Sequence, residues 1–141
     1  MASIFTRIID GEIPGRFVWR DERAVVFFTI APISTGHVMV VPIEEVDHWV
    51  DLDPDLAAHL MRVAQVVAQA QMAAFSPTRI GLIIAGLEVP HTHLHLIPID
   101  SEADLSFAKA DPSAPAAEQD AAAEALRSAL RTMGRTEVAE A

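Results

Sequence analysis

The order of apolar and polar positions along the chain predicts a β-sheet whose strands come from two parts of the sequence. Short apolar or alternating runs bounded by turn residues are expected to form strands at residues 16–20, 24–30, 37–43 and 79–84. Asp21 and Glu22 suit a tight hairpin between the first two runs, and residues 31–36 supply a longer turn before the third. The first three strands are therefore expected to form an antiparallel meander.

A long amphipathic helix is expected between the third and fourth strands. Apolar residues recur at spacings of three and four over residues 56–74, so that one helix face is apolar and is expected to lie on the sheet. Asp53 is placed as the N-cap and Pro54 at the first helical position. Pro77 ends the helix, because proline lacks the amide hydrogen that would continue it.

The last third of the sequence differs in composition from the rest. Residues 100–113 are polar and acidic, and the alanine-rich residues 114–133 predict a C-terminal helix. A frayed tail is expected from about residue 134. The 141 residues fit a single domain, in which about the first 98 hold the sheet, the long helix and a histidine-rich strand.

Charge and composition limit the kinds of partner that the protein is expected to bind. The net charge is −10, with 20 acidic and 10 basic residues, and such a surface repels the phosphate backbone of nucleic acids. The sequence has no cysteine, which fits a reducing compartment. Neither a signal peptide nor an apolar run long enough to span a bilayer is recognised. A cytoplasmic protein that binds neither nucleic acid nor membrane is expected.

Three histidines at two-residue spacing, His91, His93 and His95, are the strongest chemical feature of the sequence. Side chains alternate between the faces of an extended strand, so the three imidazoles are expected on one face. Three stacked imidazoles pack no better than valine or threonine, which have the higher strand propensity. The row can ligate a metal ion, transfer protons or attack an electrophile such as phosphorus.

Other candidate residues are weaker on sequence grounds. His37 lies at the start of a strand, and two roles are equally open to it: a structural residue or a hydrogen-bonding partner of the triad. His48 and His59 are expected to face solvent. Gly86 permits a positive φ and the close approach of a ligand. Glu88 falls on the opposite face from the triad by simple alternation, which leaves the imidazoles without a carboxylate to complete a metal site.

The run His-Thr-His-Leu-His-Leu-Ile at residues 91–97 resembles the signature of the histidine triad (HIT) superfamily, His-x-His-x-His followed by two apolar residues. Residues 5–14 are similar to the amino-terminal segment of that family, and residues 31–42 to its Pro-x-x-x-Gly-His strand. The resemblance implies an α+β fold with a five-stranded, mostly antiparallel sheet and two main helices. It also implies a homodimer in which two sheets join into one.

The resemblance implies a nucleotide-binding hydrolase or transferase that cleaves a nucleoside monophosphate from a phosphoramidate, a dinucleoside polyphosphate or a similar conjugate. His93 corresponds to the nucleophile of the family, His91 and His95 to residues that bind phosphate oxygens and manage protons, and His37 to a supporting histidine. A nucleophilic imidazole needs one free nitrogen, so a hydrogen bond from the other nitrogen of His93 to a backbone carbonyl is expected. No cofactor is required.

By the same resemblance, the nucleotide-binding positions are Thr29, Ile30, Gly86, Leu87 and Glu88, and purine nucleoside monophosphate conjugates are the expected ligands. Thr29 stands where the family has an aspartate that contacts the ribose, and Leu87 where it has glutamine. These departures predict altered nucleoside recognition. They also leave open a second hypothesis, a non-catalytic nucleotide-binding or sensing protein that retains the fold.

A further departure concerns a metal. Many bacterial relatives carry a Cys-x-x-Cys pair that binds a structural zinc ion, but here Ser3 and Thr6 occupy those positions. Glu45 stands where a histidine is common. The resemblance therefore implies no zinc site in this chain, and no metal ligands are predicted.

Overall fold

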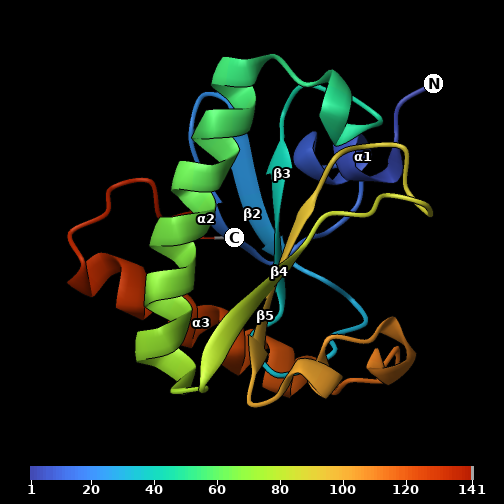
Figure 1. The fold of residues 1–141 in the computed structure, drawn as a ribbon. Coiled ribbons are helices and arrows are strands. Elements are labelled where there is room, and N and C mark those ends of the chain that lie inside the picture. The colour runs from blue at the N-terminus through green and yellow to red at the C-terminus, as the bar shows by residue number, and fades with distance from the viewer. Residues whose placement is uncertain (141) are drawn as a thin grey trace.

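Five antiparallel strands form one sheet in a computed structural model of the chain, which describes residues 1–140 (Figure 1). The strand order is β1-β2-β3-β5-β4. The strands are β1 (Phe17–Arg20), β2 (Ala24–Phe28), β3 (Val38–Pro42), β4 (Arg79–Ile83) and β5 (Leu94–Ile99). The helices are α1 (Ile4–Ile9), α2 (Pro54–Phe75) and α3 (Ala116–Thr132). The expected α+β class, with five strands and two main helices, is confirmed.

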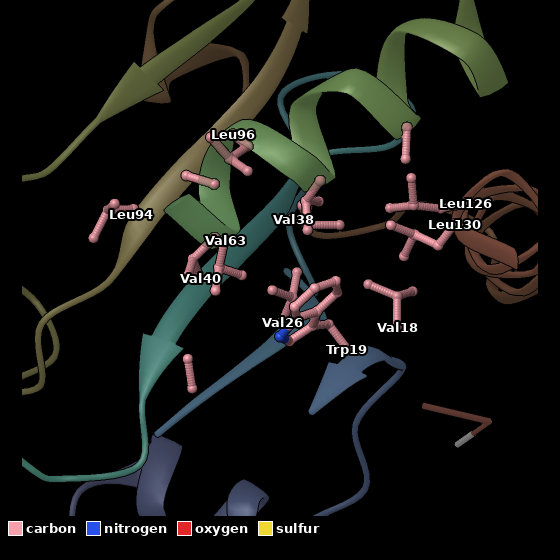
Figure 2. Close-up of a cluster of buried hydrophobic side chains, with 14 of the residues drawn as sticks. Val18, Trp19, Val26, Val38, Val40, Val63, Leu94, Leu96, Leu126 and Leu130 are labelled. Atoms are coloured by element: carbon pink, nitrogen blue, oxygen red, sulfur yellow. The ribbon is translucent and has the colours of Figure 1, made fainter. Parts of the chain in front are cut away.

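The sheet is buried on both faces, since α2 and α3 lie on one side and α1 on the other (Figure 1). Strands β2 and β3 pair without interruption from Ala24 opposite Pro42 to Phe28 opposite Val38. Alternate side chains such as Val26 therefore point to the α2 side. Figure 2 shows this core, in which side chains of four strands meet residues of α2 and α3: Val18, Trp19, Val26, Val38, Val40, Val63, Leu94, Leu96, Leu126 and Leu130.

Helix α2 has the boundaries that the sequence predicts. Asp53 is the N-cap residue and Pro54 begins the helix. The helix ends at Phe75, where Ser76 adopts a left-handed conformation with φ of 51°. The predicted apolar face, which includes Leu56, is buried against the sheet.

Helix α1 was not predicted as a helix. Ser3 caps it, because its hydroxyl oxygen accepts a hydrogen bond of 3.1 Å from the amide of Thr6. Phe5 anchors α1 on the second face of the sheet and packs edge-on against Phe27, with ring centroids 5.5 Å apart. A serine followed by apolar residues at helical spacing was the signal that the sequence carried.

The C-terminal tail differs from the expectation of fraying. After α3, which matches the predicted helix, the chain returns to the free edge of β1. The amide of Arg20 donates to the carbonyl of Glu137 at 2.9 Å, and that of Ala139 donates to Val18 at 3.1 Å. Val138 thus forms a β-bridge with Trp19. Backbone pairing of an edge strand, which the polar composition of the tail did not reveal, orders these residues.

One histidine expected to face solvent has a structural partner. His59, on α2, is only partly exposed and its Nε2 lies 2.9 Å from an oxygen of Asp21. The same carboxylate accepts a hydrogen bond from the indole of Trp19 at 2.8 Å. Asp21 therefore ties the β1–β2 turn to α2, whereas His48 is exposed as expected.

Within residues 1–140, none of the helices combines the length and the apolar character that crossing a membrane would require.

Candidate active site

The triad lies where β5 begins. The strand starts only at Leu94, so His91 and His93 belong to the segment that enters it rather than to the strand itself. The rings of His93 and His95 are nevertheless neighbours, with centroids 4.8 Å apart. Leu94 and Leu96 point into the core under α2, which leaves the intervening histidine on the α1 side of the sheet.

The hydrogen bond expected at His93 is present. Its Nδ1 lies 2.7 Å from the carbonyl oxygen of His91, and because a carbonyl can only accept, Nδ1 carries the proton. The Nε2 atom is then unprotonated and has no protein partner. Gln71 Oε1 is the one buried side-chain nitrogen or oxygen without a partner among residues 1–140, so His93 Nε2 must be open to solvent. Phe5 supports the ring edge-on, with centroids 4.8 Å apart.

His37 joins the triad from the start of β3. The amide of Ile33 donates to His37 Nδ1 at 3.0 Å, so the proton of His37 is on Nε2. That Nε2 lies 2.9 Å from Nδ1 of His95 and donates to it. The proton of His95 is therefore on Nε2, where it can be donated to a ligand. Strands β3 and β5 bring the two rings together, because Met39 is paired with His95.

His91 occupies a closed environment. Its ring is fully buried, Nε2 lies 2.7 Å from the carbonyl oxygen of Pro42, and Nδ1 lies 2.7 Å from the hydroxyl of Ser3. Both nitrogens are thus engaged by the protein. Contact with phosphate oxygens, the expected role of His91, requires a free nitrogen that this arrangement does not offer.

Burial keeps the four imidazoles neutral. Burial, together with the neighbouring histidines, lowers the pKa of His37 to about 3 and that of His95 to about 4. Burial also lowers the pKa of His91 and of His93 below the ordinary histidine value. His93 Nε2 therefore presents an unprotonated lone pair at neutral pH, as a nucleophile requires.

Phe107 is a site residue that sequence reasoning missed. It lies in a short 3₁₀ helix, Phe107–Lys109, and its ring packs against that of His95 with centroids 5.0 Å apart. About half of the Phe107 side chain remains exposed, 48% by relative area. The polar segment 100–113 thus reaches the histidines, although nothing in its composition indicated which residue would do so.

The expected nucleotide-binding residues lie in two loops, one after β2 and one between β4 and β5. Thr29 and Ile30 follow β2, where the carbonyl of Thr29 accepts a hydrogen bond of 2.8 Å from Gln119 of α3 and Ile30 is largely exposed. In the loop before the triad, Gly86 has the positive φ expected of it, 82°. Leu87 and Glu88 are exposed there, and nucleotide contact by any of these residues stays a prediction.

Metal ligation by the triad lacks convergent donors. The partners described above direct the ring nitrogens of His91, His93 and His95 to different places. Within residues 1–140, no group of three or more histidine, aspartate or glutamate side chains is arranged to hold a metal ion.

Comparison with known proteins relates the chain to one family. The model of the HIT domain family matches residues 10–102. An uncharacterised HIT-like protein of Methanocaldococcus jannaschii is 34% identical over 99 residues, which cover 67% of this chain and 77% of that protein. An adenosine 5'-monophosphoramidase of Schizosaccharomyces pombe is 29% identical over 107 residues, 72% of this chain and 77% of the enzyme. The crystal structure of a hypothetical histidine triad nucleotide-binding protein from Sulfolobus tokodaii superposes with a TM-score of 0.83 at 25% identity, covering 94% of each chain.

Proposed function

This chain belongs to the HIT family, and from that premise we propose that it cleaves a nucleoside monophosphate from a phosphoramidate or a related conjugate through a covalent intermediate on His93. The observation that carries the proposal is the hydrogen bond from His93 Nδ1 to the carbonyl of His91. It holds the ring in the one neutral tautomer whose Nε2 can attack phosphorus.

The reaction divides into two displacements at phosphorus. In the first, the lone pair of His93 Nε2 forms an N–P bond while the bond from phosphorus to the leaving amine breaks, and the amine takes a proton from water. The resulting hydroxide attacks phosphorus in the second step, the N–P bond to His93 breaks, and the nucleoside monophosphate is released. The positive charge on the nucleotidyl imidazole is stabilised by the carbonyl of His91, which accepts its Nδ1 hydrogen.

His95 is proposed to stabilise the charge that develops on the phosphoryl oxygens. The relay from Ile33 through His37 directs the Nε2 hydrogen of His95 outward, and a positioned donor of this kind is worth most in a partly buried site. His91 is assigned a different role from the one its position in the motif implies. Because both of its ring nitrogens are engaged, it is proposed to position His93 rather than to contact substrate.

An adenosine phosphoramidate is the first substrate to test, since a similar protein is an adenosine 5'-monophosphoramidase. Dinucleoside polyphosphates form a second class with the same phosphorus chemistry. Thr29 and Leu87 replace the residues that contact the nucleoside elsewhere in the family. These two substitutions favour a second candidate function, a protein that binds a nucleoside monophosphate without turning over its conjugates.

The test compares wild-type protein with His93→Ala. With adenosine phosphoramidate, the wild type is expected to release AMP and to show a nucleotidyl adduct by mass spectrometry, whereas His93→Ala loses turnover by at least about a thousandfold because the nucleophile is gone. His48→Ala, which removes an exposed histidine, is the matched control and is expected to match the wild type. Equal turnover by the wild type and His93→Ala would show that His93 is not the nucleophile. Stabilisation of the wild type by AMP without turnover would favour the second candidate.

A homodimer joined through β4 is part of this proposal. β4 is the last strand in the order, with no further strand beside it within residues 1–140. The opposite edge, β1, is covered by the bridge at Val138. A groove of about 550 Å³ runs between β4 and α2, lined by Ala58, Met61, Arg62, Ala64, Gln65, Ala68, Ile80, Leu82 and Leu96. A second copy of β4 would satisfy the open edge and cover the exposed side chains of Met61 and Leu82.

A further inference from the structure

Three side chains from two distant segments meet around the buried ring of His91. Ser3 and Thr6 belong to the start of α1, and Glu45 follows β3. One oxygen of Glu45 accepts hydrogen bonds of 2.7 Å from the amide of Ser3 and from the hydroxyl of Thr6. The hydroxyl of Ser3 lies 2.7 Å from Nδ1 of His91. We call Ser3, Thr6 and Glu45 the His91 clamp.

The donors and acceptors in the clamp fit only one arrangement. The carboxylate of Glu45 only accepts, and its hydrogen bonds to Ser3 and Thr6 lower its pKa, so the Thr6 hydroxyl donates to it. Nε2 of His91 lies 2.7 Å from the carbonyl oxygen of Pro42 at the end of β3, which can only accept, so the neutral ring carries its proton on Nε2. Nδ1 of His91 is therefore unprotonated, and the hydroxyl of Ser3, whose oxygen accepts from the amide of Thr6, donates to it.

The clamp connects directly to the nucleophile. The carbonyl of His91 holds the Nδ1 hydrogen of His93, and the amide of His91 donates to Val89 at 2.8 Å. Because the His91 side chain is fixed at both nitrogens, the peptide that carries this carbonyl has little freedom to move. Loss of the contact between Ser3 and His91 would leave Nδ1 with only the Thr6 hydroxyl, which is 3.4 Å away and already donates to Glu45, and would loosen the acceptor that sets the tautomer of His93.

The clamp residues do not fit a zinc ion. Zinc in proteins is bound by thiolate, imidazole and carboxylate groups, and two of the three clamp residues offer a neutral hydroxyl. The closest oxygen of Glu45 to His91 Nδ1 is 4.0 Å away and already accepts two hydrogen bonds. The positions where bacterial relatives carry zinc ligands are filled here by a hydrogen-bonded network whose donors and acceptors are matched.

We infer that the His91 clamp is a metal-free positioning device for the nucleophile, in which Ser3 acts through His91 to hold His93 in its reactive tautomer. The inference rests on the proposed function for its effect on rate. The tautomers themselves depend only on the hydrogen bonds within the protein.

The experiment that tests the inference measures tautomers and rates on the same variants. In long-range ¹⁵N–¹H spectra, the wild type is expected to hold His91 as the Nε2–H form and His93 as the Nδ1–H form. Ser3→Ala is expected to give mixed tautomers at both rings and to lower kcat with adenosine phosphoramidate about tenfold or more at nearly unchanged KM, since orientation rather than substrate contact is lost. Ser3→Thr keeps the hydroxyl and is expected to recover both readouts.

Thr78→Val is the matched control. Thr78 donates to Asp100 at 2.9 Å, which resembles the contact of Thr6 with Glu45 but lies at the opposite end of β5. Its loss is expected to leave the histidine spectra and kcat unchanged.

Wild-type tautomers other than those stated, or stoichiometric zinc in the purified protein, would overturn the inference. Unchanged tautomers in Ser3→Ala would do the same, even if the variant were less stable. If the wild type shows the expected tautomers but no turnover, the proposed function fails while the clamp stands, because the spectra do not depend on activity.

Discussion

At the scale of single residues, the chemistry of the site follows from partners that have only one hydrogen-bonding role. A main-chain carbonyl can only accept and a main-chain amide can only donate, so His91 and Ile33 fix the protonated nitrogens of His93 and His37. The hydrogen bond from His37 Nε2 to His95 Nδ1 then fixes the proton of His95 on its Nε2. Two adjacent rings thus present opposite functions at Nε2, a lone pair on His93 and a donor on His95.

The relay through His37 predicts different results for two substitutions at one position. Glutamine has an amide nitrogen that can donate to His95 Nδ1 from the place of His37 Nε2, so His37→Gln is expected to retain most of kcat. His37→Leu removes the donor and is expected to lower kcat about tenfold, because His95 is free to change tautomer. Steady-state kinetics with adenosine phosphoramidate measures kcat for both variants, and equal values would contradict the relay.

The buried histidines also predict how stability depends on pH. In the unfolded chain they bind protons near pH 6.5, whereas in the folded protein the pKa of His95 is about 4 and that of His37 about 3. Between these values the unfolded state binds more protons, so the free energy of unfolding decreases as pH falls. Each such histidine contributes a slope of about 1.4 kcal/mol per pH unit.

Urea unfolding at pH 7 and pH 5 measures this effect, and a loss of about 2 kcal/mol or more is expected at pH 5. His37→Gln carries one buried titrating group fewer and is expected to lose less stability over the same interval. Equal stability of the wild type at the two pH values would show that these histidines do not stay neutral in the folded protein.

At the scale of elements, the site is assembled by segments that enter strands. His37 immediately precedes β3 and His93 immediately precedes β5, and because these neighbouring strands are antiparallel, the start of β3 lies beside β5, where His37 contacts His95. The turn before β3 is held by α2. Gln71 donates from its amide to the carbonyl of Gly36 at 2.9 Å and to that of Leu96 at 3.1 Å.

Gly36 is predicted to be essential to this turn for two separable reasons. Its φ is 91°, and a Cβ at this position would lie 2.4 Å from the ring of Phe75. Gly134 has φ of 80° with no atom within 4 Å, so Gly134→Ala is the matched control for backbone strain alone. Gly134→Ala is expected to cost about 1 kcal/mol of stability, and Gly36→Ala a further ~1–3 kcal/mol from the contact with Phe75. Urea unfolding of both variants provides the measurement, and equal losses would mean that Phe75 moves away without cost.

At the scale of the whole molecule, one edge of the sheet is covered by another segment of the chain and the other edge is open. The C-terminal tail covers β1, which leaves β4 and the adjacent apolar groove as the open edge. An open edge beside exposed apolar side chains is typical of a surface that pairs with another chain. The proposed homodimer uses this surface and leaves the triad, on the other side of the sheet from α2, outside the groove.

Leu82→Glu is expected to convert the proposed dimer to monomers. The change places a charge on the open strand, and burying an unpaired charge in each half of a two-fold interface weakens association by more than about a hundredfold. Val50→Glu alters another exposed apolar residue, away from β4, and is expected to leave the dimer intact. Light scattering coupled to gel filtration measures the mass, and a monomeric wild type or a dimeric Leu82→Glu would rule out this interface.

Much of the fold was predictable because its signals are local. The strands and α2 carry apolar patterns that match their own periods, and Asp53 with Pro54 marks a helix start regardless of what lies nearby. The row of three histidines is visible in the sequence, but the strand expected for it holds only His95, because β5 begins at Leu94. Helix α1 and the tail were missed because six residues of helix and one bridge are stabilised by the sheet rather than by their own sequence.

The sequence by itself determined the class of the fold, the boundaries of α2 and the close spacing of three histidines along the chain, because each depends on the pattern of a single segment. Only the tertiary structure decided which of those imidazoles has a ring nitrogen that no other protein group engages. His91 is closed by Ser3 and Pro42 from two distant segments, and His95 is directed by His37 on another strand. A histidine's protonated nitrogen is set by the atoms it faces, and those atoms come together only when the chain folds.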